Sequence, residues 1–169
     1  MKFIFKDLTV ETEQNNLPKW DEKLSRFIGE YDCYFIKDMT DEFSRLVEES
    51  GITNGTFVAQ AMHTTCILCV NEMDEPMLLG DICRYMEKNI PKVSDYLHNS
   101  PLRTVNLCED DNKCDRNADA HIKSFLVGNH AITLLIRDGK LHLGRWQRAA
   151  LVDFDGPRSR NVTVQVSGI

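Results

Sequence analysis

An Asp-Gly turn in the C-terminal part of the chain constrains its fold more than any other feature. Asp138-Gly139 lies between two apolar, strand-like segments, Ala131 to Ile136 and Lys140 to Gly144. Asp-Gly is favoured in two-residue hairpin turns, because both central positions need positive φ angles. The pattern predicts an antiparallel hairpin here.

A second turn, Asp155-Gly156-Pro157, separates Ala149 to Phe154 from Val162 to Val166. Both segments are rich in apolar and β-branched residues, which favour strands. We predict that they form another antiparallel pair. Further strands are predicted at Phe3 to Val10, Phe57 to Met62 and Thr65 to Val70.

Helix signals alternate with these strands. Thr40 is a predicted N-cap, and Phe43, Leu46 and Val47 form an apolar stripe that ends at Gly51. Strands mixed with helices in this order predict a single α+β domain, in which helices pack on a mostly antiparallel, sandwich-like sheet core.

Three more helices are predicted. One opens at Asp74-Glu75-Pro76 and ends before Pro91, another runs from Asn117 to Val127, and a short one covers Asp21 to Ile28. The expected buried face of the first consists of Met77, Leu78, Ile82, Tyr85 and Met86.

Charge and cysteine usage narrow the possible partners. With 20 Lys and Arg against 26 Asp and Glu, the net charge is −6, which argues against a nucleic-acid or anionic-membrane surface. No stretch resembles a signal peptide or a membrane span. The six cysteines lack a regular framework, so we expect reduced thiols in a cytoplasmic protein. Cys66 and Cys69 should point to opposite faces of one strand.

Three of the five histidines, His63, His98 and His121, lie beside other polar residues. None are spaced as in a helical zinc motif. If the fold brings them together, their imidazoles would suit zinc or a similar divalent ion. Alternatively, each forms hydrogen bonds at a strand or helix end. We interpret His130 and His142 as structural or solvent-facing.

Two polar groups follow predicted strands. Asn71-Glu72 places a carboxylate at a strand end. Glu72 either acts as a general acid or base, or is an ordinary turn residue. Arg145, Trp146 and Gln147 form a cluster in which the indole either stacks on a ring or closes the core.

The turn after residue 154 carries Arg158 and Arg160, which suit bidentate phosphate binding or simple solvation. The chain has no Walker motif, dinucleotide-binding glycine pattern or nucleophile elbow.

The order of these motifs closely resembles the YjbQ-like family over about residues 36–168. The matching series is Gly55, His63-Thr64-Thr65, Asn71-Glu72, Asp81, Tyr96-x-His98, Asn117-Ala118-Asp119-Ala120-His121-Ile122-Lys123-Ser124, Leu126, Gly128, Asp138-Gly139-x-Leu141-x-Leu143-Gly144-x-Trp146-Gln147 and Asp155-Gly156-Pro157-Arg158-x-Arg160.

The resemblance implies a compact α+β homotrimer with a cleft near a subunit boundary, often holding a metal ion. It implies metal ligation by His63, His98 and His121, and a binding role for Asn71, Trp146 and Gln147. Residues 1–35 would be an N-terminal extension that packs on the core of one domain, residues 1–169.

Some positions depart from the family pattern. Arg145 stands where threonine is common, and Asn99 where aspartate is frequent. The 100–116 loop is longer than in the usual bacterial form.

The resemblance also implies an activity, thiamine-phosphate synthesis, which joins a thiazole phosphate to a pyrimidine diphosphate and releases pyrophosphate. We expect a metal-dependent enzyme for a small phosphorylated substrate, with Glu72, His63 and His121 as catalytic residues and Arg158 or Arg160 on phosphate. The alternatives are a trimer that binds a metal or small anion without turnover, and another metal-assisted hydrolase.

Overall fold

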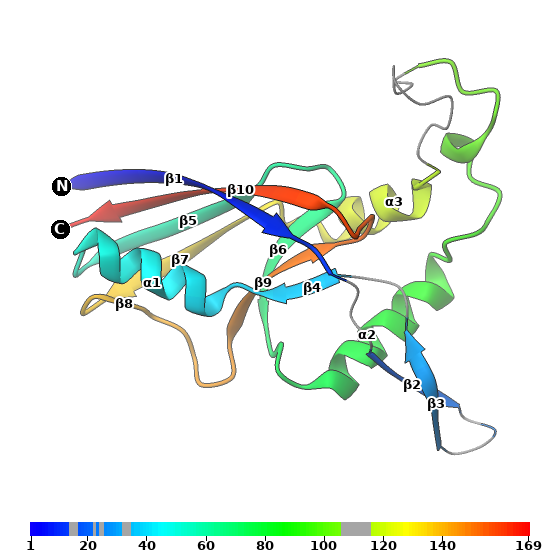
Figure 1. The fold of residues 1–169 in the computed structure, drawn as a ribbon, viewed down its shortest axis with the longest axis horizontal. Helices are drawn as coiled ribbons and strands as arrows, with labels where there is room; N and C mark the ends of the chain where they lie inside the picture. Colours follow the sequence, from blue (N-terminus) through cyan, green and yellow to red (C-terminus); the bar gives the residue numbers. More distant parts are fainter. Residues whose placement is uncertain (14–16, 22, 24–25, 32–34, 106–115) are drawn as a thin grey trace.

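A computed structural model describes residues 1–13, 17–21, 23, 26–31, 35–105 and 116–169. Residues 106–115 of the long 100–116 loop lie outside this part. The described residues form one α+β domain with three antiparallel sheets (Figure 1). None of its described helices is long and apolar enough to cross a membrane.

The largest sheet has the strand order β1-β10-β5-β7-β8. Its strands are β1 (Lys2–Glu11), β10 (Ser159–Gly168), β5 (Gly55–Ala61), β7 (Ala131–Arg137) and β8 (Lys140–Leu141). The predicted β7–β8 hairpin is confirmed, because Asp138 and Gly139 have φ angles of 52° and 75°. Leu8 and Val10 on β1 belong to the main core, so the N-terminal segment contributes a full edge strand.

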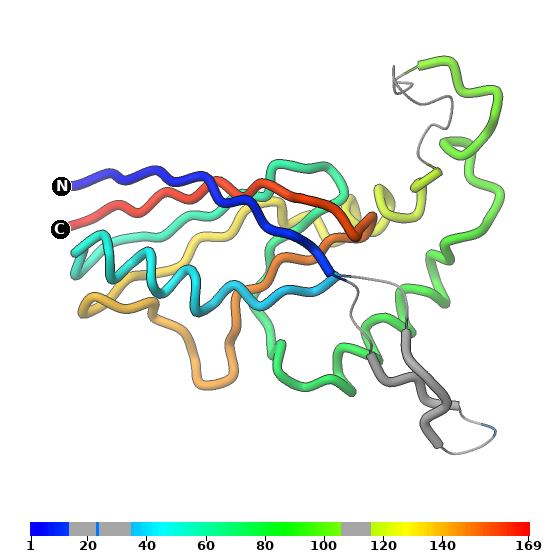
Figure 2. Tube along the Cα trace, viewed as in Figure 1, coloured from blue at the N-terminus to red at the C-terminus, as the bar shows by residue number. Residues whose placement is uncertain are grey.

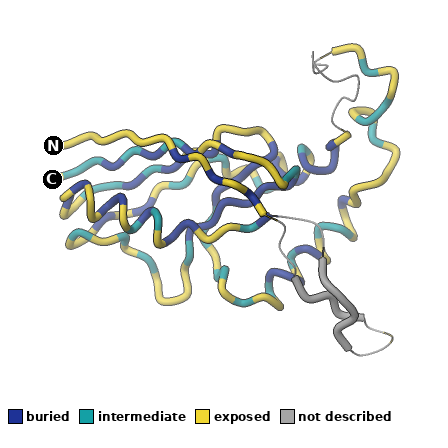
Figure 3. Tube along the Cα trace, viewed as in Figure 1, coloured by how far each residue is buried: buried dark blue, intermediate teal, exposed yellow. Residues whose placement is uncertain are grey.

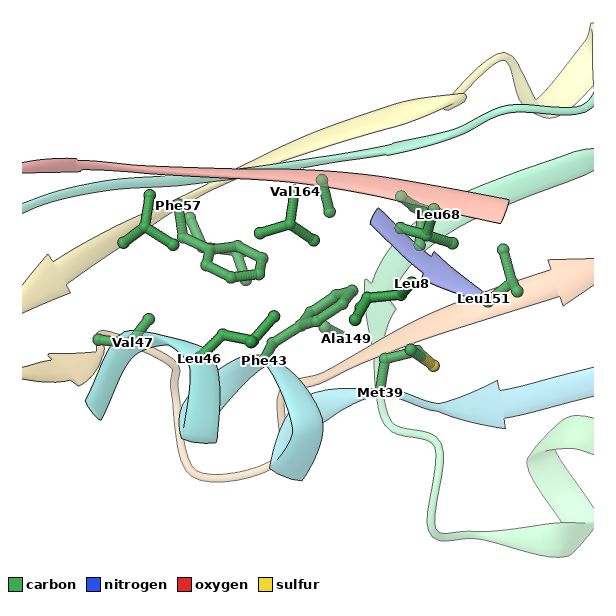
Figure 4. Packing of buried hydrophobic residues seen from close by; sticks show 14 of the residues in the cluster. Leu8, Met39, Phe43, Leu46, Val47, Phe57, Leu68, Ala149, Leu151 and Val164 are labelled. Atoms are coloured by element: carbon green, nitrogen blue, oxygen red, sulfur yellow. The ribbon is translucent and has the colours of Figure 1, made fainter. Parts of the chain in front are cut away.

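Helix α1 (Thr40–Ser50) covers one face of this sheet (Figure 4). Phe43, Leu46 and Val47 point from α1 toward Phe57 and Val164 on the strands, as their spacing predicted. The rings of Phe43 and Phe57 lie 4.8 Å apart. Figure 3 shows this buried layer between helix and sheet.

The second sheet has the order β4-β9-β6, with β4 (Phe35–Asp38), β9 (Arg148–Asp153) and β6 (Cys66–Asn71). The predicted pairing of residues 149–154 with 162–166 is therefore wrong, since β9 and β10 belong to different sheets. The reason is burial: nearly every residue of β9 is buried, so the strand takes a central place with a neighbour on each edge. Cys66 and Cys69 contact the main and second core clusters respectively, which confirms their opposite directions.

The remaining elements are α2 (Pro76–Asn89), a short 3-10 helix η1 (Leu97–Asn99), α3 (Ala118–Val127) and the hairpin β2 (Leu17–Asp21) with β3 (Arg26–Tyr31). Figure 2 shows the chain after α2 passing beside the start of α3, where Asn99 meets Ala118, and then continuing away from it. The helix predicted at residues 21–28 is wrong, because so short a helix is marginal and pairing with β2 satisfies the backbone instead.

Two details of the helices differ from the predictions. Met39, not Thr40, is the N-cap of α1, because the Thr40 hydroxyl accepts the Ala149 N–H at 2.9 Å and so links α1 to β9. On α2, Met77 and Tyr85 are exposed, while Leu79 and Cys83 are buried. Ile82 and Met86 of the predicted face do pack against the second core cluster, so the prediction is confirmed for these two residues and wrong for Met77 and Tyr85.

Candidate functional site

A buried ion pair between Asp153 and Arg160 organises the turn after β9. Arg160 Nε donates to Asp153 Oδ2 at 2.8 Å, and Arg160 Nη2 donates to Oδ1 at 3.0 Å. The two side chains are 0% and 5% exposed, respectively. Arg160 is therefore neither a solvated turn residue nor a bare phosphate ligand, since its guanidinium is held by a carboxylate.

Further donors complete the shell around Asp153. The Thr12 hydroxyl donates to Oδ2 at 3.0 Å, and the Asp155 N–H donates to Oδ1 at 3.0 Å. Burial by itself would raise the pKa of Asp153, but the hydrogen bonds from Arg160 and Asp155 hold it below its usual value. Asp153 thus stays ionised.

The ion pair continues outward to His63 through Thr65. Arg160 Nη2 lies 3.5 Å from Thr65 Oγ1, which lies 2.9 Å from His63 Nδ1. The Thr65 N–H also points at Nδ1, at 3.3 Å. Because Nδ1 accepts this N–H, the neutral ring carries its proton on Nε2. The exposed His63 ring therefore presents an N–H donor to ligands.

The titration of His63 leads to a prediction on stability. Burial of the ring and then the charge of Arg160 lower the pKa of His63 from 6.5. The unfolded chain takes up this proton first, so the stabilisation is complete above 6.5 and is lost as the pH falls toward the folded pKa. We expect a smaller loss of unfolding free energy below about pH 6.5 in His63→Asn than in wild type. Urea unfolding over a pH series measures the free energy of unfolding of both proteins. An equal dependence of this free energy on pH in wild type and His63→Asn would contradict a lowered pKa of His63.

His98 and His121 meet at the start of α3. Their ring centroids lie 5.1 Å apart with an interplanar angle of 69°. Arg103 Nη1 lies 2.7 Å from His98 Nε2 and 3.1 Å from Nδ1. Asn99 Oδ1 accepts the Ala118 N–H at 3.1 Å. Asparagine at this position, where the family frequently has aspartate, therefore still satisfies a backbone N–H at the start of α3.

The three histidines do not form a metal centre within one chain. Among residues 1–13, 17–21, 23, 26–31, 35–105 and 116–169, no group of three His, Cys, Asp or Glu is placed to hold an ion. The Arg103 guanidinium occupies the nitrogen edge of His98, and Nδ1 of His63 already accepts the Thr65 N–H. The zinc site stays a prediction, and these residues would need donors from another subunit to form it.

The other predicted site residues lie at the opposite end of β6. Asn71 pairs with Arg148 in the sheet, and its Oδ1 accepts the Glu72 N–H at 2.9 Å. Since β6 spans six residues, about 20 Å of strand separates this end from the His63 end.

The loop that precedes β9 lies at the same end of the sheet. Gln147 Oε1 accepts the Gly144 N–H at 2.7 Å. The Arg145 guanidinium lies 4.7 Å from the centre of the Trp146 ring, which is 58% exposed. Trp146 therefore does not close the core, and its indole is available to a ring or a partner.

Four further residues, Thr12, Thr65, Asp153 and Asn117, contribute to the site without having been predicted as site residues. The sequence around Asp153 could have identified it, because an acidic residue at the end of an apolar, buried strand needs a charge partner. No such signal marks Thr12, because its role depends on β1 lying next to β10.

Comparisons with known proteins place the chain among relatives of similar size. Residues 33–169 match the family described as UPF0047 protein YjbQ-like. A UPF0047 protein of Archaeoglobus fulgidus is 39% identical over 130 residues, 77% of this chain and 89% of that protein. UPF0047 protein YugU of Bacillus subtilis is 32% identical, over 78% of this chain and 88% of that protein.

Solved structures have the same fold over nearly the whole chain. A protein of unknown function from Sulfolobus solfataricus, described as YbjQ-like, has a TM-score of 0.74 and 28% identity, and the match covers 99% of both chains. A YugU orthologue from Clostridium acetobutylicum has a TM-score of 0.69 and 29% identity, over 97% of this chain and 99% of that one.

Proposed function

Because the chain belongs to the YjbQ-like UPF0047 family, we propose that it is an enzyme for a small phosphorylated substrate, bound where β9 ends and α3 begins. The observation that carries the proposal is the series Asp153–Arg160–Thr65–His63. It holds an exposed, neutral imidazole in the tautomer that carries its proton on Nε2.

This arrangement suits phosphate chemistry. Reactions at phosphoryl groups depend mainly on positioning and on stabilising negative charge. His63 Nε2–H would donate to a phosphoryl oxygen, and Arg158 beside it would add positive charge. Arg158 Nη2 lies 3.6 Å from Asp155 Oδ2, and its side chain is 44% exposed, so the guanidinium is both oriented and accessible.

A second copy of the chain would complete the site. Glu72, Trp146 and Gln147 lie one strand length from His63. All four residues nevertheless belong to the series of motifs that matches the family. We propose that the homotrimer brings the Glu72 end of one subunit to the His63 end of the next, with Glu72 as acid or base and Trp146 as a stacking surface. Zinc would bind at the same boundary, with His121 as one ligand. A protein that stays monomeric in solution would contradict this arrangement.

Thiamine-phosphate synthesis is the specific reaction that we put forward, with the apposed subunits supplying a ring-binding wall and phosphate contacts. We place it in the cytoplasm, in keeping with the free thiols of Cys66, Cys69 and Cys83.

The test is turnover by His63 variants. In the wild type, product should form from thiazole phosphate and pyrimidine diphosphate, with pyrophosphate release. His63→Ala should lower kcat by about 100-fold, the usual contribution of a positioned proton donor, with a smaller effect on KM. His142→Ala is the matched control, because His142 is exposed on the far side of β7 and should leave kcat unchanged.

The outcomes separate the alternatives. No product from the wild type with any divalent ion would eliminate the synthase reaction. Tight binding of the phosphorylated substrates without turnover would favour the non-catalytic binding protein. Hydrolysis of the phosphate esters alone would favour a hydrolase.

A further inference from the structure

A cavity of about 300 Å³ lies beside the His63 network, between the end of α2, the start of α3 and the turn after β9. Phe35 and Phe154 form apolar walls, and Gly156 and Pro157 line the turn side. The volume is at the lower end of the range for small-molecule sites. Asp155 belongs to both the cavity and the network, since its backbone oxygen accepts from Arg160 and its side chain lines the cavity.

Asn117 places a buried acceptor in this wall. The residue is 8% exposed, and its Oδ1 has no hydrogen-bond partner among the described residues. The orientation of the amide is not arbitrary: Asn117 Nδ2 donates to Asp155 Oδ2 at 2.8 Å, and an ionised carboxylate can only accept. Oδ1 is therefore the atom without a partner, and a buried acceptor of this kind needs a donor that the described residues do not supply, such as a ligand O–H.

The charges around the cavity favour a singly charged anion. Lys92, Arg116 and Lys123 line it together with Glu87, Asp119 and Asp155. Lys123 is paired with Asp119 at 2.7 Å, and Asp155 with Arg158 at 3.6 Å.

Two cations, Lys92 and Arg116, then stand against one acid, Glu87, which leaves one net positive charge. Both cations are exposed and so are available to an entering anion.

We propose that this cavity binds a phosphoryl group in a protonated, singly charged form, with the phosphate O–H donating to Asn117 Oδ1 and the oxygens meeting Arg116 and Lys92. The apolar walls favour a phosphate monoester with a flat or apolar body over the free ion. This inference rests on the proposed function, because it assigns the substrate phosphate to a pocket that shares Asp155 with the Asp153–Arg160–Thr65–His63 network.

The discriminating probes are inorganic phosphate, sulfate and phenyl phosphate, compared at about pH 6, close to the second pKa of a phosphate ester. Phosphate carries an O–H donor at this pH, whereas sulfate carries none. The full-length protein should bind phosphate about tenfold more tightly than sulfate, the difference expected for one hydrogen bond, as measured by amide chemical-shift titration. Phenyl phosphate should bind more tightly than either ion. If inorganic phosphate binds as tightly as phenyl phosphate, the preference for an ester is overturned.

Three variants test the named contacts. Arg116→Ala and Lys92→Ala should weaken phosphate and sulfate alike, by about two- to fivefold each. Asn117→Ala should reduce the preference for phosphate over sulfate toward one. Lys140→Ala, an exposed lysine at the β7–β8 turn, is the matched control and should change neither affinity.

Equal affinity of the wild type for phosphate and sulfate would overturn the proposal even if Asn117→Ala does not fold. Affinities unchanged by Arg116→Ala and Lys92→Ala would overturn it as well. Since these are binding measurements without turnover, they succeed or fail independently of the His63 kinetics, which test the proposed reaction.

Discussion

Replacing Asp153 with alanine is expected to lower the free energy of unfolding by about 3–5 kcal/mol, because it leaves the buried Arg160 charge without a counterion. Asp153 is fully buried and makes two short hydrogen bonds with Arg160, and Thr12 and the Asp155 backbone bind the same carboxylate. The turn after β9 and the His63 site would lose their common support. The loss of this support should also change the chemical shift of the Thr65 backbone amide.

Thermal and urea unfolding measure the effect. At about 2–4 °C per kcal/mol for a chain of this length, the midpoint of thermal unfolding should fall by roughly 6–20 °C. The matched control is Asp74→Ala, which removes a carboxylate 3.9 Å from Arg148 at the surface and should cost about 1 kcal/mol or less.

The double variant Asp153→Leu/Arg160→Met separates pairing from packing. It should lose less than the sum of the two single variants, because neither charge is then left alone. An Asp153→Ala protein as stable as Asp74→Ala would show that the ion pair does not support the fold.

Replacing Phe43 with alanine is expected to cost about 3–5 kcal/mol, the usual penalty for removing a buried aromatic side chain. Phe43 is fully buried, and its ring lies 4.8 Å from that of Phe57. The substitution leaves a cavity between α1 and the five-stranded sheet (Figure 4) that closely packed neighbours cannot fill.

Phe125→Ala provides the comparison. Phe125 lies on α3 with 83% of its surface exposed, so its removal should change the free energy of unfolding by about 0.5 kcal/mol or less. Urea unfolding of both variants measures the difference. If Phe43→Ala is tolerated as well as Phe125→Ala, the helix–sheet layer is not the main core.

Local patterns predicted most of the individual elements. The Asp138-Gly139 turn, the stripe of Phe43 and its neighbours on α1, and the start of α2 after Asp74-Glu75 all depend on residues close in sequence. The errors occurred where a distant partner decides the outcome. The Thr40 hydroxyl accepts the Ala149 N–H and so does not cap α1. Strand β9 pairs with β4 and β6 instead of its sequence neighbour β10.

The candidate site shows the same limit. The motif order identified His63, His98, His121, Arg158 and Arg160 as residues of interest. It did not predict that Arg160 would bind Asp153, that Arg103 would contact His98, or that Glu72 and Trp146 would lie at the other end of β6. Residue identity specifies which bonds a side chain can make, but not which neighbour will be within reach.

The sequence by itself determined the α+β class, the antiparallel hairpin, the amphipathic helix on the sheet and the family, because each follows from residue order and periodicity. The tertiary structure alone decided the tautomer of His63, the neutralisation of Arg160 and the unpartnered oxygen of Asn117. Each of these depends on how the folded chain orients and buries the side chains, even where the partners are close in sequence, as His63 and Thr65 or Asp153 and Arg160 are. Burial turns an ordinary polar side chain into one that must have a specific partner, and that requirement arises only when the chain is folded.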